Sequence, residues 1–260
     1  MMCIWGMFWN LLIVAAILKN RVLRNSSTFL LLTLHFLACT VDVGSRLVFD
    51  VPSEILGRPL FRLSVNYDDI PTKSFHYTTY TCWFIQLYSL IAIAASHILA
   101  VYGTIYYARF NQKKTLILIF IIILLSMISV CYLWSPKFPI KFHEEFWGWS
   151  EDRGYPLVEF FFYYNYVVQV SVVNSGSTLA PKRHRERTEL KVSINFIIVS
   201  LFLLCQTLIY IVCPLYNSEF AHFLLFIAPI FRGSKCLAYL VSGSALRNAI
   251  VDLVKCRKHF

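Results

Sequence analysis

Histidine and cysteine, the side chains that most often carry out chemistry, are scattered along this 260-residue chain. The seven histidines include no pair at the spacing of metal ligands on one helix, and the eight cysteines include no CxxC pair. The chain also lacks the GxSxG, HExxH and glycine-rich phosphate-binding motifs. We therefore predict neither an enzyme nor a metal site, and no bound cofactor.

One neighbouring pair, Ser96 and His97, supplies a hydroxyl next to an imidazole. A nucleophilic site would also need an acid to orient the imidazole, and no acidic residue in the sequence is identifiable in that role. The pair is therefore interpreted as a hydrogen-bonded contact between packed helices.

The composition indicates what kind of structure must position these residues. Hydrophobic residues make up 58% of the chain and charged residues 15%, whereas a soluble domain has about 45–50% and about 25%. These values exclude a disordered chain and favour a membrane protein. In a soluble protein the formal net charge of +10 would suggest a nucleic-acid partner. In a membrane protein the positions of the cations instead indicate which loops face the cytoplasm. We expect no nucleic-acid partner.

A helix that crosses the bilayer needs about 20 mostly apolar residues, because the hydrocarbon core is about 30 Å thick. The sequence contains seven such segments, at residues 1–18, 28–49, 79–107, 115–134, 157–173, 194–215 and 220–242. The fourth has neither a charge nor a helix breaker, whereas the fifth and the seventh carry charges. Omitting either of those two would leave six spans.

The charges between the segments decide the number of crossings. The regions after the first, third, fifth and seventh segments hold 15 cations and three acids, whereas the three alternate loops hold six cations and nine acids. Because Lys and Arg accumulate on the cytoplasmic side, this alternation indicates seven crossings, with the amino terminus outside and the carboxyl terminus in the cytoplasm. The first apolar run precedes its cations, unlike the apolar run of a signal peptide.

Charged residues inside the spans are the candidate site. They are Asp42 and Arg46 in the second span, Glu159 in the fifth, and Arg232 and Lys235 in the seventh. A central charge costs about 2.5–3.5 kcal/mol, so each should face the bundle and find a partner. Asp42 is four residues from Arg46. Measured from the expected cytoplasmic ends of their spans, Asp42 lies about 22 Å deep and Arg232 about 15 Å deep, so a long side chain would bridge the difference. Both a structural ion pair and a state-dependent switch fit this set.

Three short motifs carry a resemblance to a known family. Gly6 and Asn10 resemble a first-helix asparagine motif, SHILAVYGTIYY in the third span resembles the pattern SHLLIAINRFCA, and the segment from Lys235 to Tyr239 resembles Asn-Pro-x-x-Tyr with only the tyrosine kept. The chain is thus similar to the rhodopsin-like seven-transmembrane G-protein-coupled receptors, and most closely to the nematode serpentine chemoreceptors.

The chain departs from this family pattern in three places. Gly103 and Thr104 stand where the family has Asn-Arg, so the arginine that meets the G protein is absent. The sixth span has Cys-Gln-Thr-Leu where the family has Cys-Trp-x-Pro. No cysteine lies between Ser135 and Pro156, so the usual bridge from the third helix cannot form, and Cys82 either pairs elsewhere or stays free.

The expected fold is an all-α membrane protein, a seven-transmembrane helix bundle with a short amphipathic eighth helix. Apolar residues recur at positions 246, 249, 250, 253 and 254, which predicts that helix over 245–258, on the inner membrane face. The resemblance implies a plasma-membrane receptor for an external chemical cue, a small molecule or a peptide, that signals through a heterotrimeric G protein.

Two sets of residues complete the candidate site. An outer ligand region is expected around Trp147, Trp149 and Glu159, although such tryptophans more commonly act as interface anchors. For the cytoplasmic coupling surface the candidates are Thr104, Arg109, Arg183, Arg185 and Tyr239. Two alternatives stay open: a transporter or channel that uses Asp42, Arg232 and Lys235 as a polar path, and a non-signalling receptor partner.

Overall fold

The computed structural model describes residues 2–56, 70–102, 111–131, 140–143, 148–151 and 244–255, together with positions 205, 236 and 240. The helices are α1 (Met2–Lys19), α2 (Arg21–Arg24), α3 (Ser27–Leu56), α4 (Ile70–Tyr102), α6 (Gln112–Ser129) and α10 (Ser244–Val254). Strands β1 (Ile140–His143) and β2 (Gly148–Glu151) form an antiparallel hairpin in the segment expected to be a loop.

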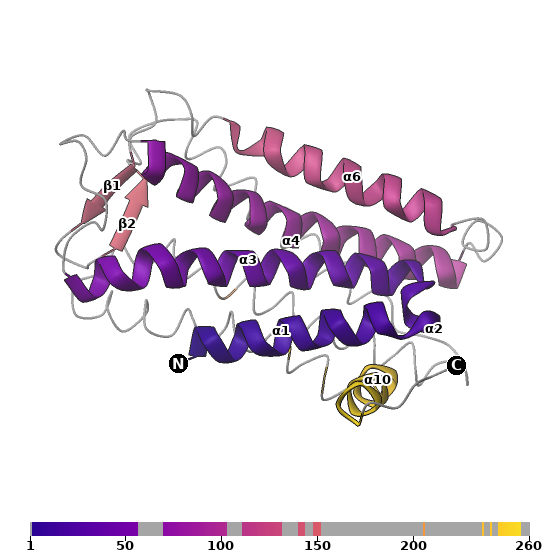
Figure 1. Ribbon diagram of the computed structural model, residues 1–260. Helices are drawn as coiled ribbons and strands as arrows, with labels where there is room; N and C mark the ends of the chain where they lie inside the picture. The colour runs from indigo at the N-terminus through magenta and orange to yellow at the C-terminus, as the bar shows by residue number, and fades with distance from the viewer. Residues whose placement is uncertain are drawn as a thin grey trace.

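The four long helices lie side by side in the order α1, α3, α4 and α6, and each runs opposite to its neighbour (Figure 1). The contact between α3 and α4 is the most extensive, and that between α1 and α3 is next. One end of this layer carries α2 and α10, and the other carries the hairpin. We call these the α2 end and the hairpin end.

A tight turn explains why α1 and α3 are antiparallel. Asn20 ends α1 and caps α2, because its side-chain Oδ1 accepts hydrogen bonds from the backbone N–H groups of Val22 at 3.0 Å and Leu23 at 3.2 Å. Asparagine is a preferred residue at this position because it satisfies amide groups that the first helical turn leaves without partners. The chain therefore reverses within a few residues.

The two central helices extend beyond the predicted spans at the hairpin end. The span predicted at 28–49 lies within α3, which continues to Leu56 and contains Pro52 in its last turns. The span predicted at 79–107 corresponds to α4, which begins at Ile70. This earlier start brings Thr72, Phe75 and His76 onto the helix, opposite the end of α3.

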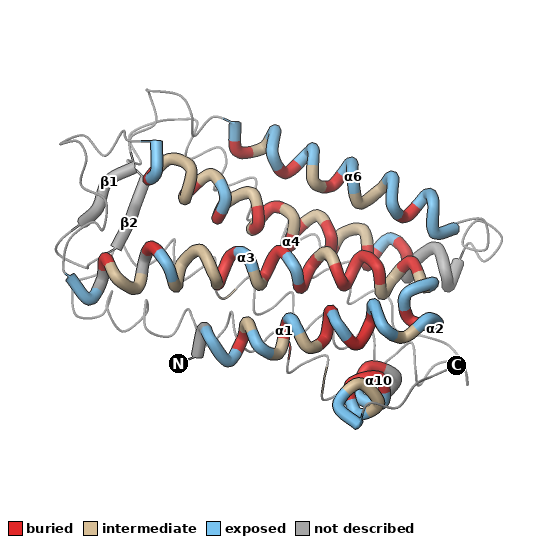
Figure 2. Tube along the Cα trace, viewed as in Figure 1, coloured by how far each residue is buried: buried red, intermediate tan, exposed pale blue. Residues whose placement is uncertain are grey.

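The apolar core lies between α1, α3 and α4 (Figure 2). Its largest fully buried apolar side chains are Phe36, Phe84, Ile13, Ile17, Leu31, Leu87 and Leu90. In contrast, α6 is apolar but mostly exposed, and only a narrow stripe that includes Thr115, Ile122 and Ser126 is buried. A wide exposed apolar face is what a helix in contact with lipid needs. The buried stripe is polar where the Thr115 hydroxyl donates to Ser27 Oγ at 2.7 Å.

Three of the described helical segments are long and apolar enough to cross a membrane: Ser27–Ser53, Ile70–Ser96 and Gln112–Ser129. The apolar part of α1, Ile4–Lys19, is shorter. The spans predicted at 157–173, 194–215 and 220–242 lie outside the described residues, apart from positions 205, 236 and 240.

Helix α10 covers much of the segment predicted at 245–258 and packs against α1 (Figure 2). Leu246, Ala249 and Ile250 are buried, whereas Arg247 and Lys255 are exposed. This division into two faces follows the spacing of the apolar residues.

The packing of α1 on α3 at Gly44 can be tested directly. A Cβ atom added at Gly44 would lie 3.6 Å from Cε of Met7, an ordinary contact. Since glycine costs about 1 kcal/mol relative to alanine inside a helix, Gly44→Ala should raise the Tm of the purified protein in detergent. Gly44→Ile should lower it, because the larger side chain must displace Met7. A lower Tm for Gly44→Ala would contradict this description of the contact.

Candidate functional site

An ion pair lies inside the helix layer, in the hairpin-end half of α3. Nε of Arg46 donates to Oδ1 of Asp42 at 3.1 Å, and the side chains are 23% and 3% exposed. The two residues are one helical turn apart and so share a face of α3. Because both belong to α3, this bond does not by itself tie two helices together. It holds the guanidinium in one orientation.

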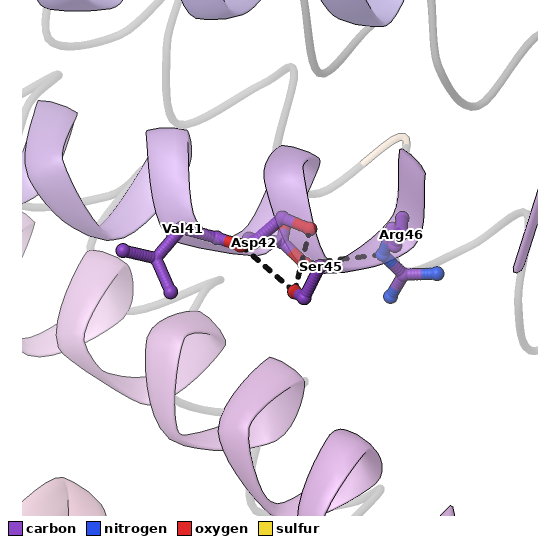
Figure 3. A network of polar contacts seen from close by, with 4 residues as sticks. All are labelled: Val41, Asp42, Ser45 and Arg46. Carbon is purple, nitrogen blue, oxygen red and sulfur yellow. Dashed lines mark hydrogen bonds and ion pairs between the residues drawn. The ribbon is translucent and has the colours of Figure 1, made fainter. Parts of the chain in front are cut away.

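The hydroxyl groups around this pair bond to the backbone of α3 itself. The Ser45 hydroxyl donates to the carbonyl oxygens of Val41 at 2.8 Å and Asp42 at 3.0 Å (Figure 3). Thr40 donates in the same way to the carbonyl of Phe36 at 2.8 Å, and Ser53 to that of Phe49 at 2.7 Å. Such bonds satisfy hydroxyls where water is scarce, so they place no demand on neighbouring helices.

Next to the ion pair, one turn closer to the hairpin end, aromatic rings join α3 to α4. Phe49 of α3 stacks on Phe75 of α4, with ring centroids 4.1 Å apart and planes inclined by 16°. His76 is buried and meets both rings edge-on, at 6.2 Å from Phe49 and 5.0 Å from Phe75. The rings of Phe49, Phe75 and His76, which we call the aromatic wall, therefore lie about one helical turn from the ion pair.

A second polar group joins the same two helices deeper in the layer. Nδ1 of His35 lies 3.2 Å from Ser89 Oγ and 3.3 Å from the carbonyl oxygen of Gln86. The Ser89 hydroxyl donates to that same carbonyl at 2.9 Å, so its proton is already used. Nδ1 must therefore be the protonated nitrogen of His35 and act as the donor. All three residues are fully buried.

Two cysteine side chains lie at the interface between α3 and α4. Cys39 of α3 and Cys82 of α4 are both buried, and neither belongs to a disulfide. Cys82 was expected either to pair elsewhere or to stay free, and it is free. Within the described parts of the chain, no group of three His, Cys, Asp or Glu side chains could hold a metal ion.

Of the predicted site residues, the structure brings Asp42 and Arg46 together. Trp149 belongs to β2, where the backbone alone is described. The others lie outside the described residues, and these are Arg232, Lys235, Trp147, Glu159, Thr104, Arg109, Arg183, Arg185 and Tyr239. The alternative pairing of Asp42 with Arg232 is therefore still a prediction.

Several residues of this site were not singled out in the sequence. Phe75 and His76 precede the predicted span, which begins at residue 79, and Lys73 counts among the cations of the loop before it. His35 was one of seven scattered histidines, although it stands seven residues before Asp42 and thus on the same face of α3. That spacing is the signal that could have revealed it.

The sequence model of one protein family, the serpentine type 7TM GPCR chemoreceptor Srx, matches residues 1–231. The chain belongs to the Srx family. No curated protein matches the chain. The match confirms the serpentine chemoreceptor resemblance and the all-α seven-transmembrane fold, and it makes this Srx receptor a multi-pass membrane protein with a chemosensory role. The matched region ends before α10.

The strength of the pair in this Srx receptor can be measured with a double-mutant cycle. Arg46→Gln leaves the buried Asp42 carboxylate without its cation, which should cost about 3–5 kcal/mol of stability. The double variant Asp42→Asn with Arg46→Gln removes both charges and should recover at least half of this loss. Thermal unfolding of the purified receptor gives the four values.

Ser45→Ala is the matched control, because its hydroxyl donates within α3 to the carbonyls of Val41 and Asp42. It should cost about 1 kcal/mol or less. If the double variant loses as much stability as the two single variants combined, the charges do not interact in the way the geometry indicates.

Proposed function

We propose that this Srx receptor detects an external chemical cue at the plasma membrane and signals through a heterotrimeric G protein. The observation that carries the proposal is the family match over residues 1–231. The ion pair within α3 and the aromatic contact between α3 and α4 support it, because both lie in the half of the layer that we assign to the outside. Neither the transporter nor the channel alternative gains a specific observation.

The distribution of exposed cations supports the orientation that this proposal requires. Lys19, Arg21 and Arg24 lie at the end of α1 and in α2. Lys113 and Lys114 lie in the first turn of α6, Arg247 lies in α10, and Lys255 directly follows α10. All are exposed, and all lie at the α2 end (Figure 1). Because cations accumulate on the cytoplasmic side, we assign the α2 end to the cytoplasm.

Glycosylation mapping tests this orientation. An Asn-x-Thr acceptor engineered into residues 57–69, between α3 and α4, should be glycosylated in cells. The same acceptor in residues 103–110, between α4 and α6, should stay unmodified. The natural acceptor at Asn25 should also stay unmodified, since Ser27 is buried and bonded to Thr115. Digestion with a glycosidase followed by a gel shift reads the result. Modification at 103–110 alone would reverse the assignment.

Coupling to the G protein is proposed to involve the cytoplasmic candidates Thr104, Arg109, Arg183, Arg185 and Tyr239. Thr104 stands where the wider family has the arginine that meets the G protein. Restoring that charge with Thr104→Arg should raise agonist-independent nucleotide exchange several-fold in membranes that contain the receptor and a G protein. Thr104→Gln, of similar length but uncharged, should leave the basal rate unchanged.

The absence of that arginine also favours a second candidate function, a partner that assembles with other receptors and does not signal itself. The same measurement separates the two. Both the natural chain and Thr104→Arg are first shown to reach the cell surface. If neither then raises the nucleotide-exchange rate of the G protein above the rate in membranes without receptor, the signalling proposal fails and the partner function stands.

A further inference from the structure

Five exposed cations lie close together in the sequence at the α2 end. They are Lys19, Arg21, Arg24, Lys113 and Lys114. The two segments that contain them, residues 19–28 and 111–116, have no acidic residue. Within the described parts of the chain, none of these five side chains takes part in a hydrogen bond or an ion pair. Their charge is therefore available to an anionic partner from outside the protein.

One hydrogen bond joins the two segments in space. The Thr115 hydroxyl donates to Ser27 Oγ at 2.7 Å, and both side chains are buried. Lys114 directly precedes Thr115, and Arg24 precedes Ser27 by three residues, a distance of at most about 11 Å along the chain. The start of α6 and the turn that contains α2 thus meet at the same end of the layer (Figure 1). We call the cations on the two sides of this bond the corner cations, and they are Arg21, Arg24, Lys113 and Lys114.

The position of two corner cations makes a nearby negative charge favourable. Lys113 and Lys114 lie in the first turn of α6, where the aligned peptide dipoles already give the helix a partial positive charge. That turn contains no acidic residue. Its cap is uncharged, because Oδ1 of Asn111 accepts from the backbone N–H of Lys114 at 3.1 Å. An anion next to the corner cations would be attracted by the side chains and by the helix together.

Exposed apolar side chains border the corner cations. Val22 of α2 is 78% exposed, and Leu116 and Ile117 of α6 are 52% and 60% exposed. Ile117 lies about 4.5 Å farther along α6 than Lys114, towards the bilayer core. A water-soluble anion would interact with the cations alone. A phospholipid matches both features, because its headgroup carries the negative charge and its acyl chains cover the apolar side chains below.

We propose that the corner cations bind the headgroup of an anionic phospholipid from the cytoplasmic leaflet. Arg24 and Lys114, on the two sides of the hydrogen bond that joins their segments, donate to the phosphate oxygens of the headgroup. The acyl chains lie along Leu116 and Ile117. The choice of leaflet rests on the orientation proposed above, and the cytoplasmic leaflet is the one rich in anionic lipids.

Phosphatidylserine and phosphatidylcholine with the same acyl chains provide a matched pair of probes, because the first has a net negative charge and the second has none. Glycerophosphoserine carries the serine headgroup without acyl chains. The purified full chain in detergent is titrated with each compound, bound lipid is counted by native mass spectrometry, and thermal unfolding is followed. Phosphatidylserine should bind saturably and raise the Tm. Phosphatidylcholine should bind at least tenfold more weakly, and glycerophosphoserine should leave the Tm unchanged.

Neutral variants locate the binding. A cation next to an anionic headgroup contributes about fivefold in affinity. Arg24→Gln and Lys114→Gln should therefore each weaken phosphatidylserine binding about fivefold, and the double variant should weaken it at least tenfold. Lys255→Gln is the matched control, because Lys255 is an exposed cation of the same end that directly follows α10. It should change the affinity less than twofold.

Three results would overturn the proposal: equal binding of the two lipids, an equal rise in Tm with glycerophosphoserine, or an equal loss of affinity in Lys255→Gln. The first would remove the role of charge, and the second would indicate a site for a soluble anion. The third would indicate a diffuse attraction to every cation at this end.

The outcome is separate from that of the receptor proposal, because protein in detergent has no leaflets. Phosphatidylserine binding that depends on Arg24 and Lys114, together with reversed glycosylation, would leave the lipid site standing and remove the proposed orientation. The expected glycosylation pattern without preferential phosphatidylserine binding would do the reverse.

Discussion

The hydrocarbon core of a bilayer contains no water, so a polar group inside it must find its partner within the protein. The helices meet this constraint for the backbone, and the hydroxyls of Thr40, Ser45 and Ser53 meet it by bonding to carbonyls of their own helix. The remaining polar side chains must pair across or along helices. Most of the specific structure between α3 and α4 follows from this requirement.

The requirement also sets which kinds of contact join α3 and α4 along their length. His35, Gln86 and Ser89 form a hydrogen-bonded contact between α3 and α4, and apolar core residues surround it. Towards the hairpin end the contacts change in character. There Pro52 cannot donate an amide proton to the carbonyl of Val48, and the rings of Phe49 and Phe75 stack between the two helices. The hydrogen-bonded contact and the aromatic contact thus share one pair of helices.

Much of this fold could be predicted from the sequence, because hydrophobic length and loop charge are strong signals in membrane proteins. The long apolar runs at 28–49 and 115–134 overlap α3 and α6, and the spacing of Leu246, Ala249 and Ile250 marks the buried face of α10. The family resemblance rested on individually weak motifs, and the match over 1–231 confirms it.

The site was predictable only in part. The sequence allowed two partners for Asp42. Arg46 is four residues away on the same helix, and Arg232 lies at a similar depth in the membrane. The aromatic wall was missed for a different reason. Hydropathy is low around Lys73 and His76, so the predicted span begins only after them, at residue 79. The helix itself begins earlier, at Ile70, because its backbone hydrogen bonding extends beyond the apolar segment. Hydropathy reports where lipid is, whereas the helix follows its own hydrogen bonds beyond that boundary.

The contact between α10 and α1 has a consequence for how the receptor is made. Ribosomes deliver α1 first and α10 last among the described helices, so Leu246 and Ile250 reach their places on α1 after the other described helices have been synthesised. The contact therefore joins the first and the last of the described helices, and it forms only after the other described helices have left the ribosome.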